Sequence, residues 1–152
     1  MRTFPGLPHR LHHAHERDGV AYIDDSKSTT PEATLLAVSA LRETWRSDQI
    51  HLIVGGYDKG ADLTPISDLA PALAKLYTIG TTGSRIATDS PSNAIESETL
   101  ERAMAHILES VHTGDVVLLS PGCASWDQFT NYEERGQRFV QYANRPIGAT
   151  PC

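Results

Sequence analysis

Residues 20–31 read VAYIDDSKSTTP. The apolar, extended segment 20–23 runs into a turn that holds carboxylates, a lysine and several hydroxyls, and a helix is expected to begin at Pro31. A strand that passes directly into a helix is the unit of an open α/β sheet, in which ligands bind where strands end and helices begin. Helix capping accounts for Thr30 and Pro31 but not for the Asp-Ser-Lys run at 25–27. The stretch therefore predicts an α/β fold and, at the same turn, a site for something negatively charged.

The rest of the chain repeats this unit. Segments 11–15 and 20–24 flank an Asp-Gly step that suits a hairpin, and the apolar runs 50–54, 75–79 and 115–119 predict buried strands. Helical spacing of apolar residues predicts helices at 31–43, 66–74, 82–88, 97–110 and 129–143. We therefore expect a three-layer, Rossmann-like α/β domain over residues 1–143, with a mostly parallel sheet and an N-terminal β-hairpin. Residues 144–152, rich in Pro, Gly and Thr, are expected to form a flexible tail.

Composition excludes several classes of protein. The chain has 152 residues, of which 39% are hydrophobic and 21% charged, which fits one globular domain. A net charge of −6 argues against general nucleic-acid binding. Two cysteines suit a reducing compartment, and no apolar run is long enough to cross a membrane. We expect a cytoplasmic protein with no nucleic-acid or membrane partner.

Polar loops follow three of the predicted strands. They cover residues 25–30, 55–62 and 120–125, and they should converge on one edge of a parallel sheet. Lys27, Lys59 and Ser125 would meet there, together with glycines that let the backbone approach a ligand. Two lysines with several hydroxyls suit a small acid with more than one carboxylate.

Other familiar motifs are missing or weak. The sequence has neither a Gly-x-x-x-x-Gly-Lys-Ser/Thr loop nor a Gly-x-Gly-x-x-Gly fingerprint, so it has no phosphate cradle of those kinds. Four histidines between residues 9 and 15 lack the spacing of a metal site, and we expect no metal here. Cys123 has no histidine placed to activate it and is expected to be a small buried residue.

Four motifs in order resemble one family. They are LPHR at 7–10, DSKST at 25–29, GGYDKGAD at 55–62, and SPGCASWDQF at 120–129, which is followed by Arg135-Gly136. Together they resemble the carboxy-terminal domain of the Mur ligases, in the branch that adds D-glutamate to UDP-N-acetylmuramoyl-L-alanine. The Asp-Ser-Lys loop discriminates this branch, because sibling ligases carry His- or Asn-containing loops there. The chain departs mildly from the usual motifs at Ser28, Thr30 and Tyr132.

The resemblance implies an ATP-dependent amide ligase of peptidoglycan synthesis that works through an acyl phosphate. Carried over position by position, the D-glutamate contacts are Lys27, Thr29, Lys59, Ser125 and Tyr132, and the contacts to the nucleotide's phosphate and ribose are Arg10 and Asp25. Among these, Lys27 and Arg10 would serve catalysis. ATP and Mg²⁺ would act in the complete enzyme, with neither bound stably by this chain alone.

The family's amino-terminal domain and its central ATPase domain have no counterpart in these residues. The chain is therefore expected to be inactive by itself and to need those domains as partners. The alternative is a free-standing module of this fold that senses an acidic metabolite or docks onto a partner.

Overall fold

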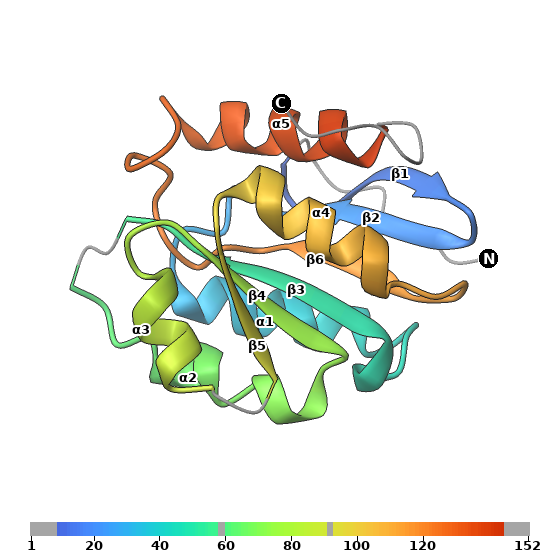
Figure 1. Cartoon of the computed structure of the whole chain (residues 1–152), viewed down its shortest axis with the longest axis horizontal. Helices are drawn as coiled ribbons and strands as arrows, with labels where there is room; N and C mark the ends of the chain where they lie inside the picture. The colour runs from blue at the N-terminus through green and yellow to red at the C-terminus, as the bar shows by residue number, and fades with distance from the viewer. Residues whose placement is uncertain (1–8, 58–59, 91–92, 145–152) are drawn as a thin grey trace.

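The computed structural model describes residues 9–57, 60–90 and 93–144. Its centre is a six-stranded sheet in the order β1-β2-β6-β3-β4-β5 (Figure 1). The strands are β1 (His12–Arg17), β2 (Val20–Asp24), β3 (Ile50–Gly55), β4 (Lys75–Ile79), β5 (Ala94–Glu98) and β6 (Val116–Leu119). Only the β1–β2 pair is antiparallel, so the mostly parallel sheet and the N-terminal hairpin are confirmed for the described residues. The hairpin turns at Asp18 and Gly19, which both have positive φ, as a tight turn of this kind requires.

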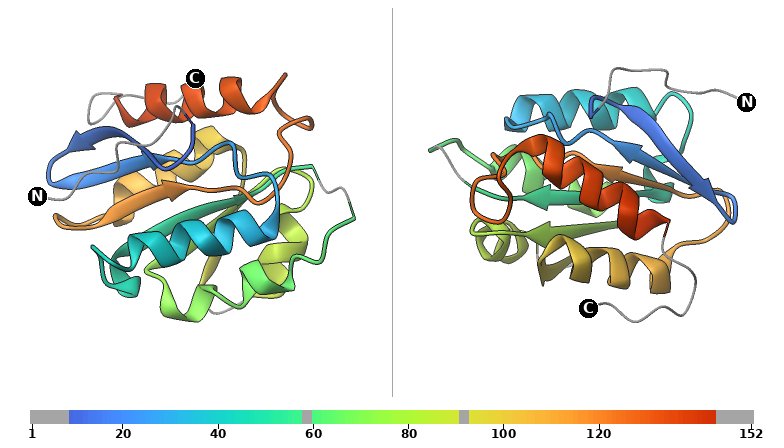
Figure 2. Two further views of the ribbon diagram at one scale, coloured as in Figure 1. Left: turned by 180° about the vertical axis from the view of Figure 1, so that it is seen from behind. Right: turned by 90° about the horizontal axis from the view of Figure 1, so that it is seen from above.

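Helices cover both faces of the sheet. They are α1 (Pro31–Leu41), α2 (Thr64–Ser67), α3 (Gly83–Thr88), α4 (Leu100–Ser110) and α5 (Tyr132–Ala143), with short 3-10 turns at Ser47–Gln49 and Ala70–Ala72. Figures 1 and 2 show α4 and α5 on one face and α1, α2 and α3 on the other. Alternation along the strands supplies both cores, because Ile23 packs with the α1 side while its neighbour Tyr22 packs with the α5 side. The predicted three-layer arrangement is thus present.

The structure differs from the expected elements at one strand and three helices. The strand β5 was not expected, since only one of its five residues is buried and they form no apolar run. The helix expected at 66–74 is instead a short α2 followed by a 3-10 turn that contains Pro71, which has no N–H to continue a helix. Helices α4 and α5 begin at Leu100 and Tyr132, a few residues later than expected, because Thr99 and Asn131 cap them.

The order of connections places a crevice at the carboxyl edge of the sheet. The connection after β2 and the connection after β3 lead to helices on the α1 face, whereas β6, which lies between these strands, leads to α5 on the opposite face. Neighbouring strands whose connections leave in opposite directions open a crevice where ligands bind in α/β sheets. No helix of the described residues is long and apolar enough to cross a membrane.

Candidate functional site at the carboxyl edge of the sheet

The loop after β6 joins the loops that follow β2 and β3. The N–H of Asp25 donates to the carbonyl of Leu119 at 2.8 Å, and the N–H of Gly122 donates to the carbonyl of Ser28 at 3.0 Å. On the other side, the N–H of Gly55 donates to the carbonyl of Pro121 at 2.9 Å. The three polar loops predicted to converge are therefore bonded to one another through their backbones.

Asp25 is buried at the base of this crevice and shapes the loop after β2. Its carboxylate accepts hydrogen bonds from the hydroxyl of Ser28, from the hydroxyl of Ser120 at 2.8 Å and from the N–H of Leu11 at 3.0 Å. Burial raises the pKa of Asp25, while these three hydrogen bonds act in the opposite direction. The side chain thus links the chain before β1, the loop after β2 and the end of β6.

Arg135, on α5, is a second buried link. Its guanidinium donates to the hydroxyl of Ser26 at 3.0 Å, to the carbonyl of Ser26 at 2.7 Å and to the carbonyl of Cys123 at 3.0 Å. The residue is 1% exposed, and this burial lowers its pKa to about 10, so that it stays charged at neutral pH. One cation therefore fixes the loop after β2, the loop after β6 and the start of α5 relative to one another.

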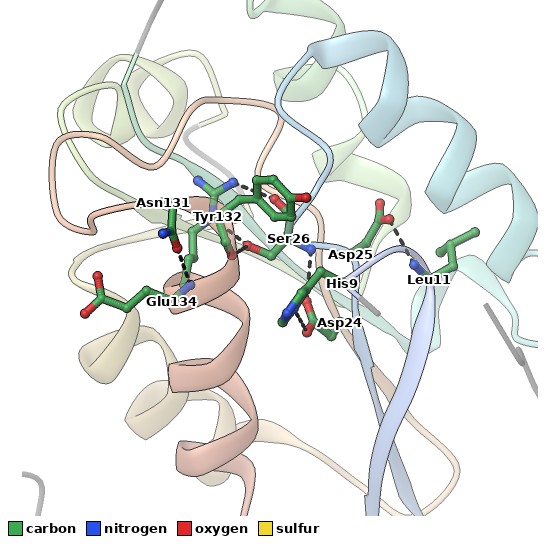
Figure 3. Close-up of polar contacts among 9 residues, drawn as sticks. His9, Leu11, Asp24, Asp25, Ser26, Asn131, Tyr132 and Glu134 are labelled. Carbon is green, nitrogen blue, oxygen red and sulfur yellow. Dashed lines mark hydrogen bonds and ion pairs between the residues drawn. The ribbon is translucent and has the colours of Figure 1, made fainter. Parts of the chain in front are cut away.

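The start of α5 also packs on a pair formed by His9 and Asp24 (Figure 3). Nδ1 of His9 lies 2.7 Å from the Asp24 carboxylate, whose other oxygen accepts the N–H of Ser26 at 3.0 Å. A Cβ on Gly136 would lie 2.3 Å from His9 Nδ1 and 2.7 Å from the Asp24 carboxylate. Only glycine at this position lets α5 come so close to the pair.

Comparison with known proteins agrees with this geometry. The sequence pattern of the family described as "Mur ligase, glutamate ligase domain" matches residues 9–123. The chain belongs to the Mur ligase family. It is 42% identical over 144 residues to the UDP-N-acetylmuramoylalanine--D-glutamate ligase of Pectobacterium atrosepticum, covering 94% of this chain and 32% of the relative. The protein of the same name from Sodalis glossinidius is 43% identical over 149 residues, covering 97% of this chain and 33% of the relative. The chain thus spans about a third of the length of these curated relatives.

Solved structures support the fold. A murein peptide ligase from Psychrobacter arcticus superposes with a TM-score of 0.64 at 13% identity, covering 96% of this chain and 32% of that one. A folylpolyglutamate synthase from Mycobacterium tuberculosis superposes with a TM-score of 0.60 at 12% identity, covering 93% of this chain and 33% of that one. The same architecture therefore recurs in proteins of widely different sequence.

The residues assigned from the Mur ligase resemblance lie around two hollows. Arg10, Asp25 and Lys27 line a hollow of about 190 Å³ that is walled by apolar residues of α1. Thr29 lines a second hollow of about 140 Å³, together with Tyr57 and Cys123. Lys27 is exposed, so its ammonium is available to an anion, whereas Cys123 is buried as predicted.

Two further assigned residues, Ser125 and Tyr132, lie in or beside the same loops. Ser125 is buried in the loop after β6, where its carbonyl accepts the N–H of Phe129 at 2.9 Å. Tyr132 is the first residue of α5, and its carbonyl accepts the hydroxyl of Ser26 at 2.7 Å. Lys59 lies outside the described residues, and its assignment stays a prediction.

Sequence reasoning did not assign a role to Arg135 or to the His9–Asp24 pair. A signal for Arg135 was present, because Tyr132, Arg135, Gly136 and Phe139 follow the spacing of one helix face, and a charged residue on a buried stripe needs internal partners. The pairing of His9 with Asp24 could not be read, since it depends on how the chain before β1 crosses the end of β2.

The described residues hold no preformed metal centre. They contain no group of three His, Cys, Asp or Glu side chains that could hold a metal. Both carboxylate oxygens of Asp25 already accept hydrogen bonds from within the protein. We therefore assign no step to Mg²⁺ on this chain.

Proposed function

We propose that this chain is the amino-acid-presenting domain of an ATP-dependent ligase that adds D-glutamate to UDP-N-acetylmuramoyl-L-alanine. The observation that carries the proposal is the Asp25-Ser26-Lys27 turn, locked against the loop after β6, in a chain more than 40% identical to ligases of that name. The remaining two thirds of such an enzyme would supply the other side of the site and complete it on closure.

We expect the charged side chains to bind the anionic groups of the substrates and the hydroxyl-bearing side chains to orient D-glutamate. Lys27 and Lys59 would pair with the two carboxylates of D-glutamate, and Thr29, Ser125 and Tyr132 would orient it, leaving its amine free to attack an acyl phosphate. Arg10 would contact the phosphate that is transferred, because its guanidinium is always charged and binds oxyanions through a planar fork. Asp25, beside Arg10 in the same hollow, would border the ribose.

A graft tests the proposal. The matching third of the Pectobacterium ligase is replaced with this chain, and ATP-dependent formation of the D-glutamyl product is measured. We expect turnover from the graft and none from the isolated chain. Lys27→Ala in the graft should raise the KM for D-glutamate by about tenfold or more, the usual cost of losing a charge-assisted contact.

Lys75→Ala is the matched control. Lys75 is the first residue of β4 and therefore lies at the opposite edge of the sheet from Lys27. A folded graft without turnover, or equal effects of the two substitutions, would contradict the proposal. In that case the alternative of a module that senses an acidic metabolite would gain weight.

A further inference from the structure

Exposed apolar side chains gather near the candidate site. The large hydrophobic residues with high exposure among those described are Leu36, Tyr57, Leu108 and Trp126. Leu36 borders the hollow that holds Arg10 and Lys27, and Tyr57 borders the hollow that holds Thr29. Leu108, in contrast, is near the end of α4, away from both hollows.

Tyr57 and Trp126 form an aromatic pair that two loops hold in place. Their ring centroids are 5.6 Å apart, with an angle of 46° between the planes, and the side chains are 43% and 63% exposed. The N–H of Tyr57 donates to the carbonyl of Ala124 at 2.8 Å, and the N–H of Ala124 donates back at 3.1 Å. This antiparallel bridge joins the loops after β3 and β6, which lie at the same edge of the sheet in Figure 1.

The base of the pair is rigid. The carbonyl of Gly56 accepts the hydroxyl of Thr81 at 2.8 Å, and its N–H donates to the hydroxyl of Thr82 at 3.0 Å. The carboxylate of Asp127, next to Trp126, accepts the N–H of Thr81 at 2.9 Å. A rigid exposed aromatic loses little conformational entropy on binding, and Trp and Tyr are the residues that most often dominate protein interfaces.

We infer that Tyr57 and Trp126 form the anchor by which this domain docks onto the rest of the ligase. The inference rests on the proposed function, and its partner is the polypeptide that makes up the other two thirds of the relatives' length. Tyr57 borders the hollow of Thr29, and Trp126 directly follows Ser125, so a surface that covers the site also covers the rings.

The test compares the same substitutions in two formats. In the first, this chain is added in trans to the remainder of the Pectobacterium ligase, and its concentration for half-maximal activity is measured. In the second, chain and remainder form the single-chain graft, in which the covalent link supplies a high effective concentration. Trp126→Ala and Tyr57→Ala should raise the half-maximal concentration in trans by about tenfold or more. In the graft, the same substitutions should lower the activity much less.

Leu108→Ala is the matched control, since Leu108 is 39% exposed and lies on α4. Leu108→Ala should change neither the half-maximal concentration in trans nor the activity of the graft. If the substitutions lowered activity equally in trans and in the graft, the rings would act in substrate binding or in folding, and the inference would be overturned. It would also be overturned if neither format lost activity. An active graft whose wild-type chain gives no activity in trans would overturn it too, because the chain would then have no docking anchor. An inactive wild-type graft would instead count against the proposed function.

Discussion

At the scale of single residues, Arg135 fixes more of the loops that form the candidate site than any of the side chains assigned to the substrate. It is almost completely buried and still determines where Ser26, Cys123 and the first turn of α5 lie. Lys27 directly follows Ser26, and Ser125 lies two residues after Cys123. Side chains that would hold D-glutamate thus depend on one guanidinium that would not contact it.

Arg135→Lys is expected to lower the free energy of unfolding by about 2–4 kcal/mol, because an ammonium cannot replace a planar fork with three buried acceptors. In the single-chain graft it should also raise the KM for D-glutamate more than the KM for ATP. Urea denaturation and steady-state kinetics measure the two effects.

Arg138→Lys serves as the control on the same helix. The Arg138 side chain is 50% exposed and lies 3.9 Å from Glu134, an exposed ion pair that should contribute little. If Arg138→Lys were as costly as Arg135→Lys, the special role of the buried guanidinium would be refuted.

At the scale of elements, α5 is positioned by its smallest residue. Glycine costs a helix about 1 kcal/mol relative to alanine, so Gly136→Ala would stabilise an isolated helix. In this fold the added methyl would meet His9 and the Asp24 carboxylate. We expect Gly136→Ala to lower the free energy of unfolding by about 1–3 kcal/mol, the usual cost of overpacking.

Thermal and urea unfolding measure this loss, with Gln137→Ala as the neighbouring exposed control. A gain in stability from Gly136→Ala would show that α5 does not need its close approach to the His9–Asp24 pair.

Elements differed in how far the sequence determined them. Strands such as β3 were predictable, because both of their faces are buried and their residues form apolar runs. The edge strand β5 was not, since its Ile95 and Ser97 are flanked by exposed glutamates and its position depends on backbone pairing with β4. The convergence of the polar loops followed from the expectation that their strands are parallel, whereas the internal partners of Asp25 and Arg135 required the tertiary structure.

At the scale of the whole molecule, the edge of the sheet opposite the site holds a buried polar chain. His51 Nδ1 lies 2.9 Å from the Tyr77 hydroxyl, and His51 Nε2 lies 2.9 Å from the Asp115 carboxylate. Burial lowers the pKa of His51, although the hydrogen bond that the Asp115 carboxylate accepts from His51 acts against this. Burial also raises the pKa of Tyr77 to about 12. The three residues tie β3, β4 and the start of β6 together with the histidine neutral.

Stability should therefore fall in acid through His51. In the unfolded chain His51 takes up a proton near pH 6.5, whereas in the folded chain its pKa is lower, so the unfolded state binds more protons below pH 6.5. The free energy of unfolding should fall by at most about 1.4 kcal/mol per pH unit as the pH falls from 6.5 toward the pKa of His51 in the folded chain. Well above pH 6.5, His51 should cause no such loss. Urea titrations at pH 7.5, 6.5 and 5.5 measure it.

His51→Gln should reduce the slope of stability against pH, and His112→Gln, which changes a histidine that is 87% exposed, should leave most of it. Equal slopes in the wild type and in His51→Gln would mean that other groups produce the acid sensitivity.

The place of β6 has a consequence for biosynthesis. This strand is the last of the six described strands to leave the ribosome, yet it lies between β2 and β3, which are made much earlier. Until residue 119 has emerged, the nascent chain carries two partial sheets with unpaired edges facing each other, and the loops after β2 and β3 have nothing to hold them. Insertion of one short strand then closes the sheet and brings the loops of the candidate site together in the same event. The interval between the emergence of β3 and the emergence of residue 119 is therefore the period in which the unpaired edges of this domain are exposed to aggregation.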